Sequence, residues 1–169
     1  LTILFYVFVY TIWLKRRTPQ NIVIGGAAGA FPPVIGWTIA TGSLSIEPLS
    51  FFLIIFFWTP SHFWALSLYK SDDYKKANIP MLPLTNGVES TKINIFVYSL
   101  LMLPVIIFPY LIDFVGLAFL IPSMILTIYY NFLCYELFNH KKNKFDPKKA
   151  KSIFGYSILY LFLIFVLFL

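Results

Sequence analysis

The sequence has few of the features on which soluble enzymes depend. It contains one cysteine, Cys134, which excludes a disulfide framework within this sequence. Charged residues make up only 12% of its 169 residues. No pair of Cys or His residues stands at metal-ligand spacing, and the sequence has no phosphate-binding Gly-rich loop and no internal repeat. These absences exclude zinc sites and soluble nucleotide-binding enzymes.

Long apolar stretches take up most of the chain. Apolar residues make up 59% of the sequence and mean hydropathy is +0.80, far outside the usage of soluble globular domains. Because about 20 apolar residues in a helix cross the hydrocarbon core of a bilayer, the sequence predicts an all-α, polytopic bundle of transmembrane helices. The complete spans are expected near 21–41, 49–69, 93–112, 116–138 and 152–169.

The chain begins within an apolar segment, 1–14, that is too short to cross a bilayer and lacks the flanking charges of a signal peptide. We interpret this segment as the end of a helix. We therefore expect that 1–169 is a single transmembrane domain whose N-terminal part is missing.

All thirteen Lys and Arg residues lie in three loops, 14–21, 69–92 and 139–151. Such loops stay on the cytoplasmic side of a membrane, or on the equivalent matrix side. We expect the three loops to share that side of a bacterial or mitochondrial inner membrane. The net charge of +6 by itself supports only binding to anionic lipid headgroups, which is the simpler interpretation of the third loop.

The first loop combines cations with side chains that form hydrogen bonds. Lys15, Arg16 and Arg17 carry the charge, and Asn21 opens the next span. Guanidinium groups bind phosphate oxygens in a fork, and lysine adds a compact charge. The loop is suited to an anion, while a signal that fixes the orientation of the chain is the alternative.

The next span carries a run of small residues. Gly25 and Gly29 form a face that lets another helix approach closely. Pro32 and Pro33 remove two backbone donors, so we expect this span to bend. A bent, glycine-lined helix is able to border a cavity.

The third apolar stretch ends in the motif 58–64, which reads Trp-Thr-Pro-Ser-His-Phe-Trp. Pro60 frees a backbone carbonyl there, and His62 brings a polar ring to membrane depth. An ionisable residue at that depth is a candidate for a functional site. A structural histidine that satisfies freed backbone groups is an equal alternative.

The sharpest signal is the acidic pair Asp72-Asp73 in the second loop. Adjacent carboxylates repel one another unless a cation joins them, and Mg²⁺ commonly bridges one or two carboxylates to substrate phosphates. The pair therefore predicts a magnesium site, and a solvated pair neutralised by neighbouring lysines is the alternative. The apolar segment 79–83, fixed by two prolines, has the composition of a lid over the headgroup region.

Three stretches carry a resemblance to a known family: 15–30, 58–66 and 73–83, the last with Asp73-Tyr74 and the run Pro80-Met81-Leu82-Pro83. They closely resemble the protoheme IX farnesyltransferases, which are UbiA-type intramembrane prenyltransferases. The specific resemblance covers roughly residues 10–92, and beyond it only hydropathy and span order agree. It implies a nine-helix fold of which this chain holds about six helices, beginning within the fourth.

The resemblance implies transfer of a farnesyl group from farnesyl diphosphate to a vinyl group of heme B, which gives heme O. Heme B is then a substrate, and Mg²⁺ is the implied cofactor, held by Asp72 and Asp73. Lys15, Arg16 and Arg17 would stabilise the departing diphosphate. The residues expected to bind substrates are Asn21, Trp58, His62, Trp64, Tyr69, Lys70 and Tyr74.

The chain departs from the family in three respects. The family's first aspartate-rich motif is absent, so only half of the catalytic centre is expected here. Many members have a second proline where this chain has Ser61, and the wider superfamily repeats an aspartate where this chain has Lys76 and Ala77. Only Asp72 and Asp73 remain as metal ligands in this loop.

The expected partners are farnesyl diphosphate, heme B, the lipid bilayer and a downstream heme A synthase or oxidase assembly; no nucleic acid is among them. The alternatives are a related enzyme with another lipophilic acceptor such as a quinone precursor, a membrane transporter and a structural respiratory subunit. A transporter would show a polar site at midplane. The charges of this chain lie at one face, which favours interfacial chemistry.

Overall fold

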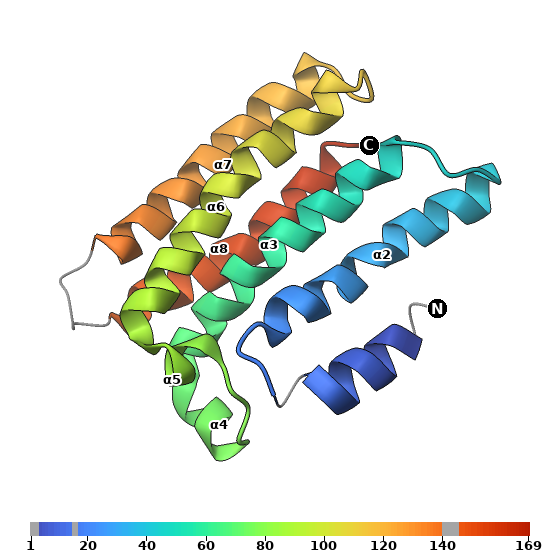
Figure 1. Cartoon of the computed structure of the whole chain (residues 1–169). Helices are drawn as coiled ribbons and strands as arrows, with labels where there is room; N and C mark the ends of the chain where they lie inside the picture. The colour runs from blue at the N-terminus through green and yellow to red at the C-terminus, as the bar shows by residue number, and fades with distance from the viewer. Residues whose placement is uncertain (1–3, 15–16, 140–145) are drawn as a thin grey trace.

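The computed structural model describes residues 4–14, 17–139 and 146–169, and within them every regular element is helical (Figure 1). The predicted all-α fold is confirmed. The elements are η1 (Phe5–Leu14, a π-helix), α2 (Asn21–Thr41), α3 (Glu47–Tyr69), α4 (Ser71–Lys76), α5 (Leu82–Thr85), α6 (Gly87–Leu111), α7 (Leu117–Phe138) and α8 (Pro147–Val166).

Five of these helices, α2, α3, α6, α7 and α8, are long and apolar enough to cross a membrane, and the chain is therefore part of an integral membrane protein. Two of them, α6 and α8, begin a turn or more before the apolar stretch that predicts them. The first turns of α6 include the polar residues Glu89 and Lys92. In α8 the carboxylate of Asp146 caps the helix by accepting a hydrogen bond from the Lys148 backbone N–H at 2.9 Å.

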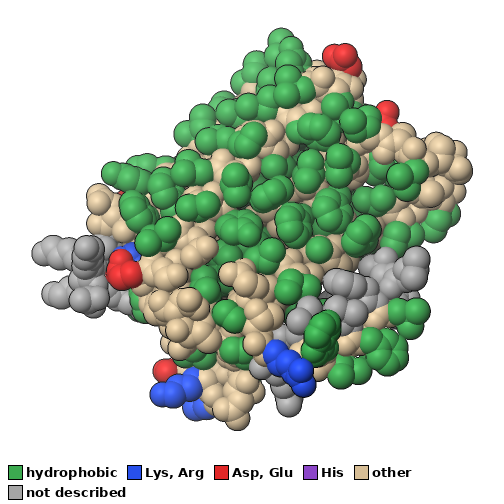
Figure 2. Space-filling view, viewed as in Figure 1, with side chains coloured by type: hydrophobic (Ala, Val, Ile, Leu, Met, Phe, Trp, Pro, Cys, Tyr) green, Lys and Arg blue, Asp and Glu red, His purple; other side chains and the backbone are tan. Residues whose placement is uncertain are grey.

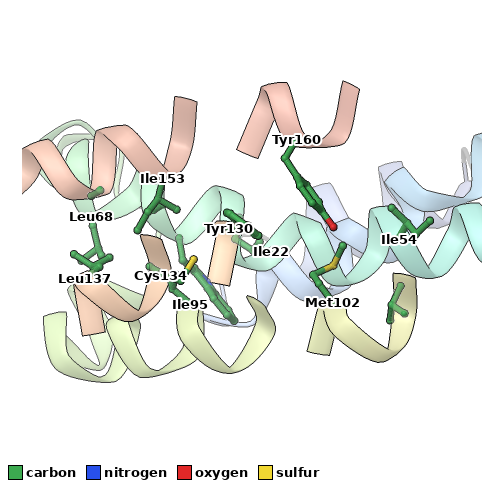
Figure 3. Packing of buried hydrophobic residues seen from close by; sticks show 14 of the residues in the cluster. Ile22, Ile54, Leu68, Ile95, Met102, Tyr130, Cys134, Leu137, Ile153 and Tyr160 are labelled. Atoms are coloured by element: carbon green, nitrogen blue, oxygen red, sulfur yellow. The ribbon is translucent and has the colours of Figure 1, made fainter. Parts of the chain in front are cut away.

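Helix α3 lies at the centre of the bundle and packs against α2, α6 and α8 (Figure 1). Helix α7 closes the far side against α6 and α8, and η1 packs against α2. Between these helices lies a core of fully buried side chains that includes Ile54, Met102, Tyr130 and Tyr160 (Figure 3). The motif 58–64 of α3 therefore lies between neighbouring helices.

Charge and hydrophobic surface are separated along the bundle. The face in Figure 2 is covered largely by hydrophobic side chains, and its visible Lys and Arg side chains lie toward the end that carries α4. Large apolar side chains such as Phe8, Ile125 and Phe162 are more than half exposed. Lipid or further apolar helices are the surroundings that such a surface requires.

The close helix contacts of α2 involve Gly25 and Gly26. A Cβ atom on Gly25 would lie 2.6 Å from the Tyr10 ring of η1, and one on Gly26 would lie 3.0 Å from Thr59 of α3. A Cβ on Gly29 would meet no atom within 4 Å. The prediction that Gly25 and Gly29 together admit one neighbouring helix is thus wrong for Gly29. Instead, the consecutive residues Gly25 and Gly26 contact two different elements, η1 and α3.

The segment 79–83 is part of the core. Met81 and Leu82 are only 5% and 3% exposed, and the short helix α5 that follows packs against α6 and α3. The interpretation of this segment as a lid over the headgroup region is wrong. Burial of these two apolar side chains between helices is favourable because it removes them from water.

Candidate functional site

A pocket of about 300 Å³ lies between η1, α2 and α3. The glycine-bearing face of α2 forms one wall, and an aromatic stretch of α3 forms the other. The lining residues are Tyr10, Ile22, Gly25, Gly26, Gly29, Ile55, Trp58, Thr59 and Phe63. A glycine-lined helix does border a cavity, and Gly29 widens it because no neighbouring atom occupies the place of its missing side chain.

Trp58 connects this pocket to α8. Its indole Nε1–H donates a hydrogen bond to the backbone oxygen of Ser157 at 2.9 Å. Its ring also stacks on His62, one turn further along α3, with the ring centroids 4.2 Å apart and the planes 18° apart. The indole is therefore fixed both by its edge and by a neighbouring ring.

His62 is 7% exposed and lies against α8. Its ring stacks on Phe154, with a centroid distance of 4.7 Å, and its Nδ1 atom lies 2.6 Å from Ser157 Oγ. The histidine thus has a side-chain partner on another helix and does not need the freed backbone carbonyl of its own helix. Its predicted contact with a substrate stays a prediction.

The acidic pair lies at the charged end, in α4. Asp72 and Asp73 are both exposed, and Asp73 Oδ2 lies 3.4 Å from Lys70 Nζ, with both side chains about half exposed or more. A salt bridge with such exposure contributes only about 0–1 kcal/mol. The carboxylates are therefore accessible to a cation from solvent.

Lysines surround Tyr69 at the same end. Lys70 Nζ lies 5.4 Å from the centre of the Tyr69 ring, and Lys151 Nζ of α8 lies 5.9 Å from it. These distances are within the range of cation–π attraction. The end of α3 and the beginning of α8 therefore present positive charge beside Tyr69.

Tyr74 is half-buried and packs against the core. Burial raises the pKa of its phenol above the ordinary value of 10.0, and the negative charge of Asp73 raises it further. The phenol thus keeps its proton at neutral pH and is able to donate a hydrogen bond to an anion at this end.

The residues of α4 fit part of a magnesium site. No group of three or more His, Cys, Asp or Glu side chains comes together among the described residues. Asp72 and Asp73 nevertheless offer the carboxylate oxygens that Mg²⁺ prefers, and this ion commonly takes one or two carboxylates and completes its shell with water and substrate phosphates. This donor set is suited to half of a centre.

The other predicted site residues are dispersed. Asn21 is buried at the beginning of α2, and Arg17 is exposed in the turn before it. Trp64 is fully buried and meets Tyr98 edge-on at 5.2 Å, so it belongs to the core and is not among the pocket's lining residues. Lys15 and Arg16 lie outside the described residues.

The contacts of three residues were not predicted from the sequence. Lys92 is 1% exposed and forms an ion pair with Glu89 at 3.0 Å; the spacing of three residues on a helix signals such a pair. Tyr10 covers Gly25 at the pocket, and Ser157 bonds Trp58 and His62 from 95 or more positions away in the sequence. No local signal in the sequence indicates the last two contacts.

Comparison with known proteins gives consistent results. The family model described as "UbiA prenyltransferase family" matches residues 1–167. The similarity therefore extends well beyond the stretch 10–92 from which the resemblance was drawn. No solved structure matches the chain.

Three relatives are similar over nearly the whole chain. Protoheme IX farnesyltransferase of Pelagibacter ubique (strain HTCC1062) is 83% identical over 99% of this chain and 55% of the relative. The protein of the same name from Parvibaculum lavamentivorans is 54% identical, over 99% of this chain and 53% of the relative. Protoheme IX farnesyltransferase 2 of Mesorhizobium japonicum is 50% identical, over 99% and 54%. The chain spans about half the length of these curated relatives.

Proposed function

Because this chain belongs to the UbiA prenyltransferase family, we propose that the protein containing it transfers the farnesyl group of farnesyl diphosphate to a vinyl side chain of heme B, giving heme O. The observation that carries the proposal is the 83% identity to a relative named protoheme IX farnesyltransferase. The proposal concerns the complete protein, since this chain covers 55% of that relative.

The pocket between η1, α2 and α3 would receive the prenyl chain. Its volume of about 300 Å³ falls at the lower end of the range for ligand pockets, and its lining is mostly apolar. Trp58 and Phe63 are aromatic residues of this lining. The allylic carbon is bonded to the diphosphate and stays at the charged end, so these rings are suited to contact the isoprenoid units further along the prenyl chain.

The charged end would bind the diphosphate. Asp72 and Asp73 would hold Mg²⁺, which when bound neutralises phosphate charge and favours departure of the leaving group. Lys70 lies beside Asp73 and would contact the same anion, together with Arg17 and with Lys15 and Arg16 of the same loop. Tyr74, protonated at neutral pH, would donate a hydrogen bond to a phosphate oxygen.

We propose that this end faces the cytoplasm across a bacterial inner membrane, or the matrix across a mitochondrial one, because it carries the basic residues that stay on that side of a membrane. Farnesyl diphosphate is an anion and would reach the site from that aqueous side. The lipophilic product would leave within the bilayer toward a heme A synthase or an oxidase under assembly.

The test is mass spectrometry of hemes extracted from membranes that carry the complete protein. Heme O is expected with the unmodified protein and not with the double substitution Asp72→Asn and Asp73→Asn. Asp113→Asn is the matched control, because Asp113 is a carboxylate residue in the α6–α7 turn, away from the end that carries α4. Absence of heme O with the unmodified protein, together with prenylation of an aromatic quinone precursor, would replace heme B by that acceptor.

A further inference from the structure

Ser157 of α8 forms two contacts with the motif on α3. Its backbone oxygen accepts the indole N–H of Trp58 at 2.9 Å, and its hydroxyl oxygen lies 2.6 Å from His62 Nδ1. Ser157 is fully buried. One residue of α8 therefore fixes both rings of a stacked pair on α3.

The direction of the hydrogen bond between His62 and Ser157 follows from the remaining partner of the serine. The Ser157 hydroxyl donates to the backbone oxygen of Phe154 at 2.7 Å, and a carbonyl oxygen only accepts. The single hydroxyl proton is thus used, so Ser157 Oγ accepts from His62 Nδ1–H. His62 is held as a donor at Nδ1.

The stack places His62 behind the wall of the pocket. Trp58 is a lining residue of the pocket, whereas His62 is not among its described lining residues. His62 covers the Trp58 ring at 4.2 Å, and Phe154 covers the other side of His62 at 4.7 Å. The position of the indole at the pocket thus depends on a column of rings that ends on α8.

We propose that His62 and Ser157 are positioning residues that hold the Trp58 indole in the wall of the pocket. The proposal rests on the proposed function, because it assigns this pocket to the prenyl substrate. His62 acts through Trp58 and not by contact with the reacting atoms. The orientation of the wall is therefore decided by a helix that contributes no described lining residue to the pocket.

The test observes Trp58 directly, by ¹⁹F NMR of the complete protein labelled with 5-fluorotryptophan. The resonance of Trp58 is the one that Trp58→Phe removes. Ser157→Ala and His62→Gln are expected to move and broaden it, because the indole loses its ring neighbour or its fixed orientation. His62→Asn also removes the ring but keeps an amide N–H near the Nδ1 position, so the resonance is expected to move less than in His62→Gln, whose amide lies near Nε2.

Tyr160→Phe is the matched control. It removes another buried hydrogen bond between helices, the one of 2.9 Å between Thr127 and Tyr160, and it does not involve Trp58. The Trp58 resonance is expected to stay in place in this variant. The Trp37 and Trp64 resonances report whether each variant retains its fold.

Kinetics then connect the indole to the substrate. Ser157→Ala and His62→Gln are expected to lower kcat/KM for farnesyl diphosphate by roughly 10-fold, as for a group displaced from its productive position. Tyr160→Phe is expected to stay close to the unmodified protein, and His62→Asn is expected to lose less activity than His62→Gln. A purely structural role would lower the amount of folded protein and leave kcat and KM of the remainder unchanged.

The outcomes separate the two proposals. If the unmodified protein makes no heme O, the proposed function fails, and the fluorine signal alone decides whether Ser157 and His62 hold Trp58. If the unmodified protein is active and Ser157→Ala leaves the Trp58 resonance in place, the positioning role is overturned. A moved resonance with unchanged kinetics overturns it as well, because the indole would then not bear on the substrate.

Discussion

Polar side chains at the charged end of this chain differ from those inside the bundle in how they are bonded. Asp72 and Asp73 at the charged end are exposed, and the ion pair of Asp73 with Lys70 spans 3.4 Å. Inside the bundle, by contrast, the Tyr130 hydroxyl donates to Ser61 at 2.8 Å and both residues are fully buried. Side chains at the end are available to a ligand, whereas those inside hold helices in register.

The difference follows from the surroundings. Water competes for polar groups at the end of the bundle, so a partner there is exchanged at little cost. In the interior an unmade hydrogen bond leaves a desolvated group, which costs about 1–3 kcal/mol. Loss of an end residue should therefore affect ligand binding and catalysis, and loss of an interior residue should affect stability.

The largest expected effect comes from the acidic pair. The double substitution Asp72→Asn and Asp73→Asn should lower the rate of heme O formation by about 100-fold or more, since it removes the proposed ligands of the metal. The thermal midpoint of unfolding should change little because both side chains are exposed. Rate assays on the purified complete protein check the loss of activity, and a melting curve in detergent checks the thermal midpoint. A large loss of stability would contradict the view that exposed side chains at the charged end contribute to ligand binding and not to stability.

A substitution at the contact between α2 and α3 should instead lower the stability of the protein. Gly26→Val should destabilise the protein by about 1–3 kcal/mol, because its side chain overpacks the contact with Thr59. Gly29→Val is the matched control: it adds the same side chain to the same helix at a place that is open. It should retain stability yet reduce the affinity for the prenyl substrate, because Gly29 lines the pocket.

Both glycine variants are measured by chemical unfolding in detergent and by binding of farnesyl diphosphate. Equal destabilisation by the two would show that loss of glycine from the helix matters and the contact with Thr59 does not. Equal binding by Gly29→Val and the unmodified protein would place the prenyl chain elsewhere.

A smaller effect is expected for Tyr130→Phe, which removes the donor to Ser61. Hydrogen bonds between membrane helices contribute about 0.6 kcal/mol on average, so the unfolding free energy should fall by about that amount. The Ser61 hydroxyl retains the Trp58 backbone oxygen as a partner. Unfolding free energies of Tyr130→Phe, Ser61→Ala and the double variant give the coupling energy between the two side chains. If the losses of the single variants simply add in the double variant, the hydrogen bond does not contribute to stability.

The smallest effect concerns the ionisation of Tyr74 at the charged end. Its pKa is raised first by burial and then by Asp73, so the neutral phenol is favoured in the folded protein. The resulting stability is present below the ordinary pKa of 10.0 and is lost as pH rises through the higher pKa of the folded state. Asp73→Asn should lower the pKa of Tyr74 only in part, because burial remains.

Absorbance of tyrosinate during alkaline titration measures this ionisation, with Tyr74→Phe subtracted to isolate the residue. Asp113→Asn, which alters a carboxylate outside α4, should leave the titration unchanged. A complete return of the pKa to 10.0 in Asp73→Asn would mean that burial does not contribute, contrary to the half-buried position of the phenol.

Several features were predictable because a local pattern determines them. Apolar length predicts the helical spans, whereas the magnesium site at the adjacent carboxylates of Asp72 and Asp73 stays a prediction. The resemblance in 15–30, 58–66 and 73–83 predicted the family that the match over 1–167 confirms. The ion pair of Glu89 and Lys92 could also be predicted from their separation by three residues on a helix, although the burial of Lys92 could not.

The sequence by itself determined that this chain is a bundle of membrane helices with its basic residues grouped in three stretches between the apolar spans, because hydrophobic length and charge act along the chain. Tertiary structure alone decided which neighbour each polar or small residue meets. Gly26 and not Gly29 contacts α3, the segment 79–83 enters the core, and Ser157 bonds a tryptophan and a histidine on another helix. Such contacts depend on how helices rotate and approach one another in three dimensions, and the spacing of residues along one helix does not specify them.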